Sequence, residues 1–192
     1  MSEALSCVNE DVYIVGGANS AGQAAVYMSK YARRVIMLVR GDSLAKSMSK
    51  YLIDRIIATE NITIKLRTEI VEVYGETNLE SISIVNTSTG VQETVPAKLL
   101  FILIGARPCT DWLDNTVERN ELGFIFTGSN LIHNGRNPKG WNLERQPMLL
   151  ESSVPGIFVA GDARYGSVKR VASAVGEGAI AVQLIHQYLS QV

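Results

Sequence analysis

Apolar runs near the N-terminus predict two parallel strands joined by a helix. Residues 12–15 (VYIV) are apolar and rich in β-branched side chains, and two glycines follow them. This pattern is typical of a buried strand. A second run, residues 35–39 (VIMLV), has the same character. Because a segment with helical spacing lies between the two runs, residues 11–39 are predicted to form a β-α-β unit.

Two helices are predicted from apolar residues that recur at helical spacing. Asn19 or Ser20 is placed to cap the first helix, and Asp42 or Ser43 is placed to cap the second. The apolar positions of the first helix are Ala21, Ala24, Ala25, Met28 and Ala32. The apolar face of the second helix carries Leu44, Met48, Leu52 and Ile56.

The pattern changes between residues 62 and 97, where short alternating stretches (ITIKL, IVEVY, SISIV and VQETV) are separated by turn residues. Alternation of this kind is typical of strands with one exposed face. We therefore expect an antiparallel β-meander inserted in a parallel α/β scaffold. Residues 99–104 (LLFILI) then form a continuous apolar run, which predicts a buried strand that ends at Gly105.

The second half of the chain begins with weak apolar periodicity. Residues 107–149 accumulate Asn, Gly, Pro and Trp, which predicts irregular loop and marks a change of domain. Residues 157–162 (IFVAGD) predict a strand that runs into a turn. A terminal helix is expected after them. One face of this helix carries Val171, Val175, Val182, Ile185 and Leu189.

Composition and charge exclude several classes of function. The 192 residues are 46% hydrophobic, which is ordinary for a globular protein. Lys and Arg total 18 against 19 Asp and Glu, so the formal net charge of -1 gives no electrostatic reason to expect nucleic acid or an anionic membrane as partner. The N-terminus lacks a secretory pattern and no apolar run reaches membrane-spanning length, so a cytoplasmic location is expected.

Cysteine and histidine positions predict neither a metal site nor a nucleophile–base pair. Cys7 and Cys109 are the two cysteines of the chain, and they lie far apart and outside any CxxC. No disulfide framework or zinc site is therefore expected, and both are interpreted as buried or half-buried thiols. His133 lies in a polar loop and His186 on the terminal helix, each with no partner evident in the sequence.

The strand, the GGANSAG turn and the helix that follow one another form the context of a dinucleotide-binding site. Amide groups at a helix N-terminus attract a diphosphate. The GxGxxA fingerprint maps onto Gly16, Ala18 and Ala21, and the methyl group of Ala18 is expected to weaken binding rather than abolish it. Glycines could also close such a turn with no ligand. The expected cofactor-binding residues are Gly16, Gly17, Ala18, Asn19, Ser20 and Ala21.

Cations after the second strand favour NADPH over NADH. In NAD-specific sites an acidic residue near the end of this strand binds the ribose 2′-hydroxyl, whereas an arginine accommodates a 2′-phosphate. Here Arg40 follows the strand directly, and Lys46 and Lys50 are expected one and two turns into the next helix. A solvated helix face is the alternative interpretation of the two lysines.

Three segments in this order carry a family resemblance: VYIVGGANSAGQAA, FILIGARP and VPGIFVAGDARYGSVKRVASAVGEGAIAV. Together they resemble the thioredoxin reductase family of pyridine-nucleotide flavoproteins, over nearly the whole chain. GSVKRVASAVGEG and the GWNLERQP loop look most like reductase-like modules that occur fused to sensory or regulatory domains. The family's own N-terminal glycine fingerprint for FAD has no counterpart in this sequence.

The resemblance implies an α/β fold in two parts. Residues 9–107 would form a Rossmann-like, three-layer NAD(P)-binding domain with an antiparallel β-meander. Residues 108–192 would form the C-terminal segment of an FAD-binding domain, incomplete here and ending in a helix. Family members are commonly homodimers, so a homodimer is one expected assembly.

The resemblance also implies flavin contacts. Gly161 and Asp162 match the family's Gly-Asp pair, whose carboxylate meets the flavin ribityl chain. Lys169, Arg170 and Val171 match the residues whose amides face the flavin ring. Gly105, at the end of the FILIGARP strand, is the remaining expected cofactor contact.

The implied activity is hydride transfer from NADPH to FAD and on to an acceptor, such as the disulfide of a thioredoxin-like protein. No catalytic residue is assigned, because the chain has no CxxC and Cys7 is a single cysteine. Two alternatives stay open. The first alternative to a partial reductase is a non-catalytic nucleotide-binding or regulatory module. The second is part of a dithiol-free flavoprotein that resembles ferredoxin-NADP reductases of the thioredoxin-reductase type.

Overall fold

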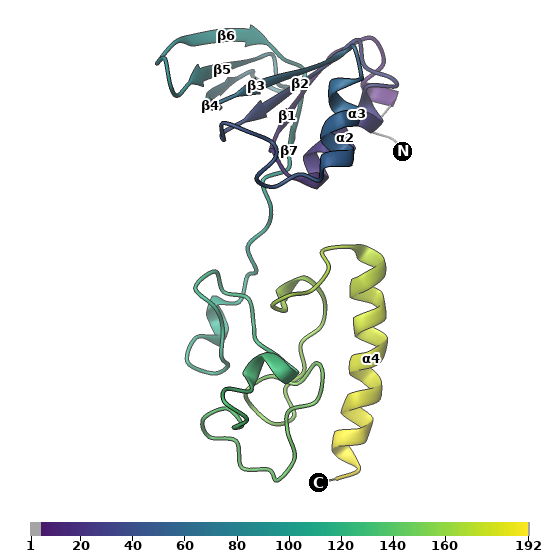
Figure 1. Ribbon diagram of the computed structural model, residues 1–192, viewed down its shortest axis with the longest axis vertical. Coiled ribbons are helices and arrows are strands. Elements are labelled where there is room, and N and C mark those ends of the chain that lie inside the picture. The colour runs from purple at the N-terminus through teal and green to yellow at the C-terminus, as the bar shows by residue number, and fades with distance from the viewer. Residues whose placement is uncertain (1–4, 192) are drawn as a thin grey trace. The chain divides into compact units, whose positions relative to one another are not determined.

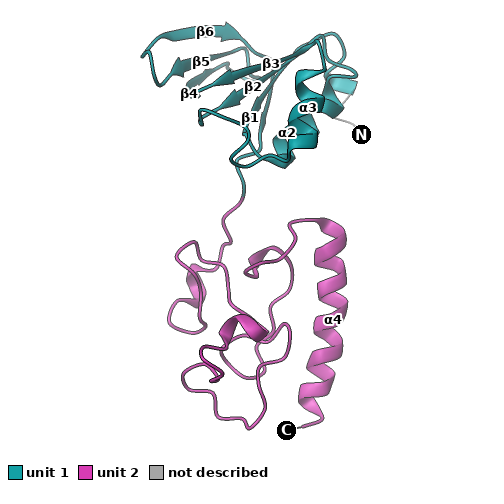
Figure 2. Ribbon diagram, viewed as in Figure 1, with its two compact units in different colours: residues 1–105 teal, residues 106–192 magenta. Residues whose placement is uncertain are grey.

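The computed structural model describes residues 5–191. The chain divides into two compact units, of which the first ends at Gly105 and the second begins at Ala106 (Figure 2). Each unit is described by itself. Among the described residues no helix combines the length and the apolar character that a membrane crossing needs.

A parallel sheet forms the centre of the first unit. Its strands have the order β3-β2-β1-β7, and all three neighbouring pairs are parallel. The strands are β1 (Asp11–Val15), β2 (Arg34–Val39), β3 (Ile62–Leu66) and β7 (Leu99–Ile102). Helix α2 (Asn19–Met28) connects β1 to β2, and helix α3 (Lys50–Ile57) connects β2 to β3.

A separate antiparallel sheet gives the unit its third layer. It consists of β4 (Thr68–Tyr74), β5 (Ser81–Asn86) and β6 (Gln92–Pro96), in that order. The side chains of β1 alternate between the layers, because Val12 and Ile14 pack with the helices while Tyr13 packs against Ile82 and Ile84 of β5. The helices and the antiparallel sheet thus cover opposite faces of the parallel sheet (Figure 1). The expected α/β fold with an inserted antiparallel meander is confirmed.

The boundary of that meander was predicted wrongly. Residues 62–66 (ITIKL) pair with β2 in the parallel sheet and belong to no antiparallel pair. Their alternation has another cause, since β3 is the outermost strand and leaves Thr63 and Leu66 exposed. Strand β7, at the other edge, is only half-buried and stops at Ile102, which is 61% exposed, so the expected buried strand through Ile104 is also corrected.

The second helix starts later than its apolar pattern indicates. Leu44 and Met48 are buried against α2 as expected, but they lie in a turn-rich segment, and α3 begins only at Lys50 with Ser49 as N-cap residue. Asp42 and Ser43 therefore cap no helix. The hydroxyl oxygen of Ser43 accepts a hydrogen bond from the amide of Ala45 at 3.1 Å, and such local bonds compete with helix formation.

The second unit is mostly irregular, as predicted for residues 107–149. Its regular elements are η1 (Asp111–Leu113), η2 (Gly128–Leu131), η3 (Gly161–Ala163) and α4 (Val171–Leu189). A small core forms around Val117, Ile125 and Val159. The strand expected at residues 157–162 is wrong: the segment makes one isolated bridge, between Glu151 and Phe158, and has no continuous ladder.

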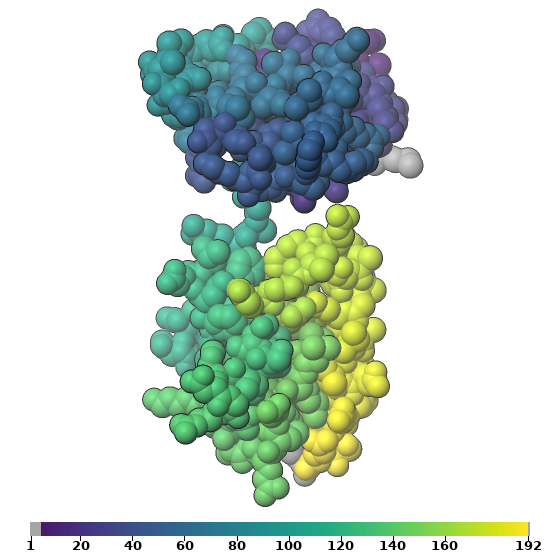
Figure 3. Space-filling view, in the orientation of Figure 1, coloured from purple at the N-terminus to yellow at the C-terminus, as the bar shows by residue number. Residues whose placement is uncertain are grey.

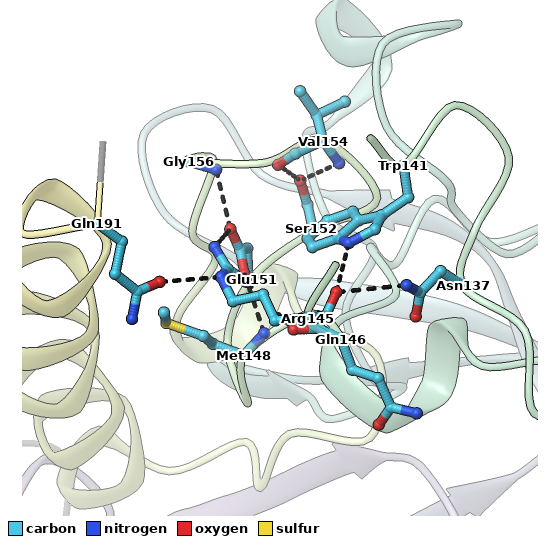
Figure 4. A network of polar contacts seen from close by, with 10 residues as sticks. All are labelled: Asn137, Trp141, Arg145, Gln146, Met148, Glu151, Ser152, Val154, Gly156 and Gln191. Carbon is cyan, nitrogen blue, oxygen red and sulfur yellow. Dashed lines mark hydrogen bonds and ion pairs between the residues drawn. The ribbon is translucent and has the colours of Figure 1, made fainter. Parts of the chain in front are cut away.

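A network of polar contacts holds the loop before this bridge (Figure 4). The buried carboxylate of Glu151 accepts hydrogen bonds from the guanidinium of Arg145 at 2.6 and 3.0 Å. The amides of Met148 and Gly156 donate to the same carboxylate at 2.9 and 3.0 Å. Arg145 also donates to the side chain of Gln191, next to α4, at 3.2 Å. The network therefore fixes the loop where backbone pairing does not.

The apolar face predicted for the terminal helix exists, but it is not buried within the second unit. Val171 is 83% exposed, Val175 67% and Leu189 62%, whereas Ala181 is the buried residue of α4. In Figure 3 the yellow atoms of this helix form a continuous strip along one side of its unit. An apolar face of this extent is typical of a surface that another protein segment covers.

Candidate functional site

The turn after β1 is built around one glycine with a positive φ. Gly16 has a φ of +144°, a conformation that side chains rarely adopt, and its amide donates to the carbonyl of Leu38 at 3.0 Å. A β-carbon at this position would lie 2.4 Å from the carbonyl oxygen of Leu103. That oxygen is close because the amide of Leu103 donates to Val15 at 2.8 Å. Gly16 thus lets the ends of β1, β2 and β7 meet at the edge where α/β proteins bind ligands.

Helix α2 starts directly at this edge with its amide groups available. Ala18 is the N-cap residue and no side chain caps the helix, so the expected cap by Asn19 or Ser20 is wrong. The first amides of a helix have no acceptor within it. The amides of Asn19, Ser20 and Ala21 are therefore a positive helix end with the donor chemistry that fits a dinucleotide diphosphate.

Ala18 replaces the middle glycine of the fingerprint with no backbone strain. Its φ of −99° and ψ of 178° are extended values that any residue adopts. The residue is exposed, whereas a β-carbon at the preceding Gly17 would lie 2.9 Å from a methyl carbon of Val39, which would have to shift. The methyl group of Ala18 therefore faces solvent at the place where a diphosphate would approach.

Of the three cations after β2, Arg40 and Lys46 lie in the segment of residues 40–49, outside any helix. Arg40 is exposed at the end of β2, and Lys46 pairs with Asp42 at 2.8 Å, which lowers the pKa of that carboxyl. Lys46 is thus not one turn into a helix as predicted. Lys50 is the first residue of α3 rather than two turns into a helix as predicted, and it pairs with Asp54 at 2.7 Å.

Two serines of this segment were not recognised as site residues from the sequence. The hydroxyl group of Ser47 donates to the carbonyl of Gly17 at 2.9 Å, and the amide of Ser49 donates to the side-chain oxygen of Asn19 at 2.8 Å. The signal was the serine-rich run SLAKSMS, whose residues favour turns over helix interior. Both bonds join the 40–49 segment to the turn after β1.

The second unit holds the predicted flavin contacts around η3. Gly161 has a φ of +76°, and its amide donates to the carboxylate of Glu177 at 2.7 Å. Arg164 donates to both oxygens of the same carboxylate, from Nε at 3.1 Å and from its terminal nitrogen by a short hydrogen bond. The hydrogen bond from Arg164 is the largest cause of the lowered pKa of Glu177, and the Gly161 amide adds to it against the effect of burial. Glu177 and Arg164 were missed in the sequence because they lie 13 residues apart.

Lys169 connects η3 to the start of α4. Its ammonium group donates to the carbonyl of Asp162 at 2.8 Å and lies 4.3 Å from the ring centre of Phe124. The carboxylate-bearing residue Asp162 is exposed, Arg170 is the N-cap residue of α4 and Val171 its first residue. No side chain caps α4 either. An exposed carboxylate beside free amide donors fits ribityl hydroxyls and an electron-rich flavin edge.

Gly105 belongs neither to the residues around the turn after β1 nor to those around η3. It ends the first unit with a φ of +93°, and a β-carbon there would meet nothing within 4 Å. The turn after β1 and the 40–49 segment form one candidate site in the first unit, and Gly161 to Val171 form another in the second.

Comparison with known proteins adds a family match. The pattern described as "Pyridine nucleotide-disulphide oxidoreductase" matches residues 2–178. A "34.2 kDa protein in rubredoxin operon" of Clostridium pasteurianum is 28% identical over 94% of this chain and 52% of its own length. Thioredoxin reductase of Chlamydia pneumoniae is 31% identical over 94% of this chain and 52% of its own length. NADPH-dependent thioredoxin reductase 3 of Arabidopsis thaliana is 33% identical over 92% of this chain and 30% of its own length.

Solved structures show the same fold. Thioredoxin reductase of Lactococcus lactis, described in its FR conformation, superposes with a TM-score of 0.76 at 22% identity, over 100% of this chain and 56% of its own. The enzyme of T. acidophilum gives 0.72 at 23% identity, over 99% of this chain and 55% of its own. The chain spans about half the length of the first relatives it matches.

Proposed function

Because this chain belongs to the pyridine nucleotide-disulphide oxidoreductase family, we propose that it binds NADPH in the first unit and contributes one part of an FAD site in the second. The thioredoxin reductase-like character expected from the sequence is confirmed. The observation that carries the proposal is the uncapped start of α2, which faces the edge where Arg40 leaves β2.

The first unit would recognise the two ends of the nucleotide separately. The amides at the start of α2 would donate to the diphosphate, since the positive end of a helix stabilises anions. Arg40 and Lys46 would pair with the 2′-phosphate that distinguishes NADPH from NADH. Lys50 would contribute less, because its ion pair with Asp54 lies within α3.

The second unit would hold part of the flavin. Asp162 would accept hydrogen bonds from ribityl hydroxyls, and the amides at the start of α4 would donate to the flavin ring. Glu177 would keep the η3 turn in place through the amide of Gly161. FAD, when bound, supplies a hydride acceptor for NADPH and a donor for a further acceptor, such as a disulfide.

We propose that a complete reductase needs residues beyond these 192. The exposed apolar face of α4 supports this, because Val171, Val175 and Leu189 would be covered by the remainder of a flavin-binding domain. The partial coverage of the relatives agrees with it. Measuring the flavin that the purified 192-residue chain retains after incubation with FAD tests this step; a full complement of flavin that NADPH reduces would contradict it.

The NADPH proposal is tested on the chain itself by titration with NADPH and NADH. We expect tighter binding of NADPH, and about a tenfold loss for Arg40→Ala with NADH unaffected, as for one charge-assisted phosphate contact. Lys98→Ala is a matched control, since it removes one exposed cation just before β7, at the end of the parallel sheet opposite the turn. The absence of NADPH binding at millimolar concentration would sink the proposal.

A non-catalytic nucleotide-binding module is the second candidate function. One observation favours it for this chain: of its two cysteines, Cys7 is buried, Cys109 is exposed, and neither belongs to a CxxC motif. Cys109 thereby corrects the expectation of two shielded thiols, because it lies in irregular chain at the start of the second unit. A yellow protein that reduces an artificial acceptor with NADPH would support an enzyme, including a dithiol-free reductase. A colourless protein that binds NADPH would support a module.

A further inference from the structure

Two side-chain hydrogen bonds join the turn after β1 to the 40–49 segment, which carries Arg40 and Lys46. Ser47 donates to the carbonyl of Gly17 at 2.9 Å, and Asn19 accepts from the amide of Ser49 at 2.8 Å. The bonded residues lie 30 positions apart in the chain in both cases. The two bonds engage the turn on either side of Ala18, the residue from which α2 starts.

These polar residues are not used for the local roles that their types usually have. Asn19 is a good helix cap by type, yet its side chain makes no cap bond and reaches across to the other segment. Ser49 is the N-cap residue of α3, yet its side chain caps nothing and its amide is the group that Asn19 holds. These residues therefore connect the turn after β1 to the 40–49 segment and cap no helix with their side chains.

Packing beneath the two bonds brings the segments together. Leu44, Met48 and Leu52 are buried in the same core as α2. Gly22 of α2 makes this possible, because a β-carbon there would lie 2.7 Å from Leu52 and 2.8 Å from Met48. The apolar contacts bring the 40–49 segment close to α2, and the two hydrogen bonds fix where the segment lies beside the first turn of α2.

The consequence concerns nucleotide choice. NADPH has to contact the amides at the start of α2 with its diphosphate and the cations Arg40 and Lys46 with its 2′-phosphate. Its affinity therefore depends on the distance between the start of α2 and the 40–49 segment. NADH has no 2′-phosphate and depends on the helix start alone. We propose that Asn19 and Ser47 are positioning residues that set the preference for NADPH over NADH by holding the 40–49 segment at this distance. This inference rests on the proposed NADPH site.

The test compares dissociation constants of NADPH and NADH for the 192-residue chain and for the variants Asn19→Ala, Ser47→Ala and the double variant. We expect each single variant to weaken NADPH binding about three- to tenfold, as for one net hydrogen bond, with NADH changed less than about twofold. Ser47→Thr keeps the hydroxyl group and should keep the preference. Gln92→Ala, an exposed change on β6, is the control.

The outcomes separate this inference from the proposal beneath it. If the unsubstituted chain binds neither nucleotide, the proposed function fails and the inference fails with it. If the chain binds NADPH but the variants lose NADPH and NADH equally, or lose neither, the NADPH site stands and the positioning role is overturned. Failure of Ser47→Thr to restore the preference would also overturn it. Thermal unfolding of each variant shows that binding is compared between folded chains.

Discussion

The guanidinium of Arg145 and the buried carboxylate of Glu151 form a two-point ion pair, at 2.6 and 3.0 Å, in a loop with little regular backbone pairing. The side chain of Arg145 also lies 5.5 Å from the ring centre of Trp141 and 5.7 Å from that of Tyr188 on α4. The pair thus connects the irregular loop to the terminal helix. In the second unit, side-chain contacts take the place that strands have in the first.

Glu151→Gln should strongly destabilise the second unit. The substitution leaves Arg145 in a half-buried place with its charge uncompensated, and breaking such a pair costs about 3–5 kcal/mol. Both tryptophans, Trp112 and Trp141, belong to this unit, so urea unfolding followed by tryptophan fluorescence measures the loss. Glu144→Gln, at an exposed position of the same loop, is the control and should change the free energy of unfolding little. Equal losses for the two variants would contradict a structural role of the pair.

The second unit should also lose stability in acid. Burial raises the pKa of Glu151, but hydrogen bonds from Arg145 and from the amides of Met148 and Gly156 outweigh it and lower the pKa. The pKa of Glu177 is lowered as well, chiefly by its hydrogen bond from Arg164. The stabilisation is therefore fully present above the ordinary glutamate pKa of 4.5 and is lost as the pH falls below it through the lowered values.

Urea midpoints measured between about pH 7 and pH 3 test this dependence. Glu177→Gln should flatten the profile, because its side chain no longer takes up a proton on unfolding. Glu144→Gln should leave the shape unchanged. A Glu177→Gln profile parallel to that of the unsubstituted chain would show that the Glu177 carboxylate does not contribute.

The sequence predicted the first unit better than the second, for a physical reason. In the first unit, strands β1 and β2 are covered on both faces, so their continuous apolar runs could be recognised directly. The edge strand β3 has one exposed side and alternates like an antiparallel strand, so its pairing partner could not be predicted from local pattern. Likewise Leu44 and Met48 repeat at helical spacing because they face α2, although no helix contains them.

The positions of the candidate site residues divide in the same way. The places of the glycine turn and of Arg40 could be predicted because motif and chain order put them at the ends of neighbouring strands. Ser47 and Glu177 could not, since each acts through a hydrogen bond to a residue far away in the sequence. The apolar face of α4 was predicted correctly as a pattern, but periodicity does not say whether its cover lies within the same unit.

Gly16→Ala should destabilise the first unit much more than an ordinary glycine substitution. Its φ of +144° and the carbonyl oxygen at 2.4 Å from an added β-carbon act together, and we expect a loss of about 3 kcal/mol. Gly90→Ala is the matched control, because Gly90 also has a positive φ but an added β-carbon there meets nothing within 4 Å. It should cost about 1–2 kcal/mol. Hydrogen exchange of the β1 and β2 amides measures the loss of stability in each variant. Equal protection in the two variants would show that the close contact with the Leu103 carbonyl oxygen does not add to the cost.

Asp42→Asn should raise the affinity for NADPH. Asp42 pairs with Lys46 at 2.8 Å and places a negative charge beside the proposed 2′-phosphate site. The substitution removes that repulsion and leaves the Lys46 cation for the phosphate, so we expect NADPH to bind about fivefold tighter at low salt while NADH changes little. Calorimetric titration with both nucleotides measures the change, and higher salt should reduce it.

Glu10→Gln is the matched control for Asp42→Asn, because Glu10 makes the same type of ion pair with Lys98 at 2.8 Å but lies just before β1, at the end of the strand opposite the turn. Both substitutions remove one negative charge from the first unit. If the site lies between the turn after β1 and the 40–49 segment, only Asp42→Asn tightens NADPH binding. An equal gain for both variants would mean that overall charge, rather than Lys46 beside the 2′-phosphate, decides the affinity, and the assignment of Lys46 would be wrong.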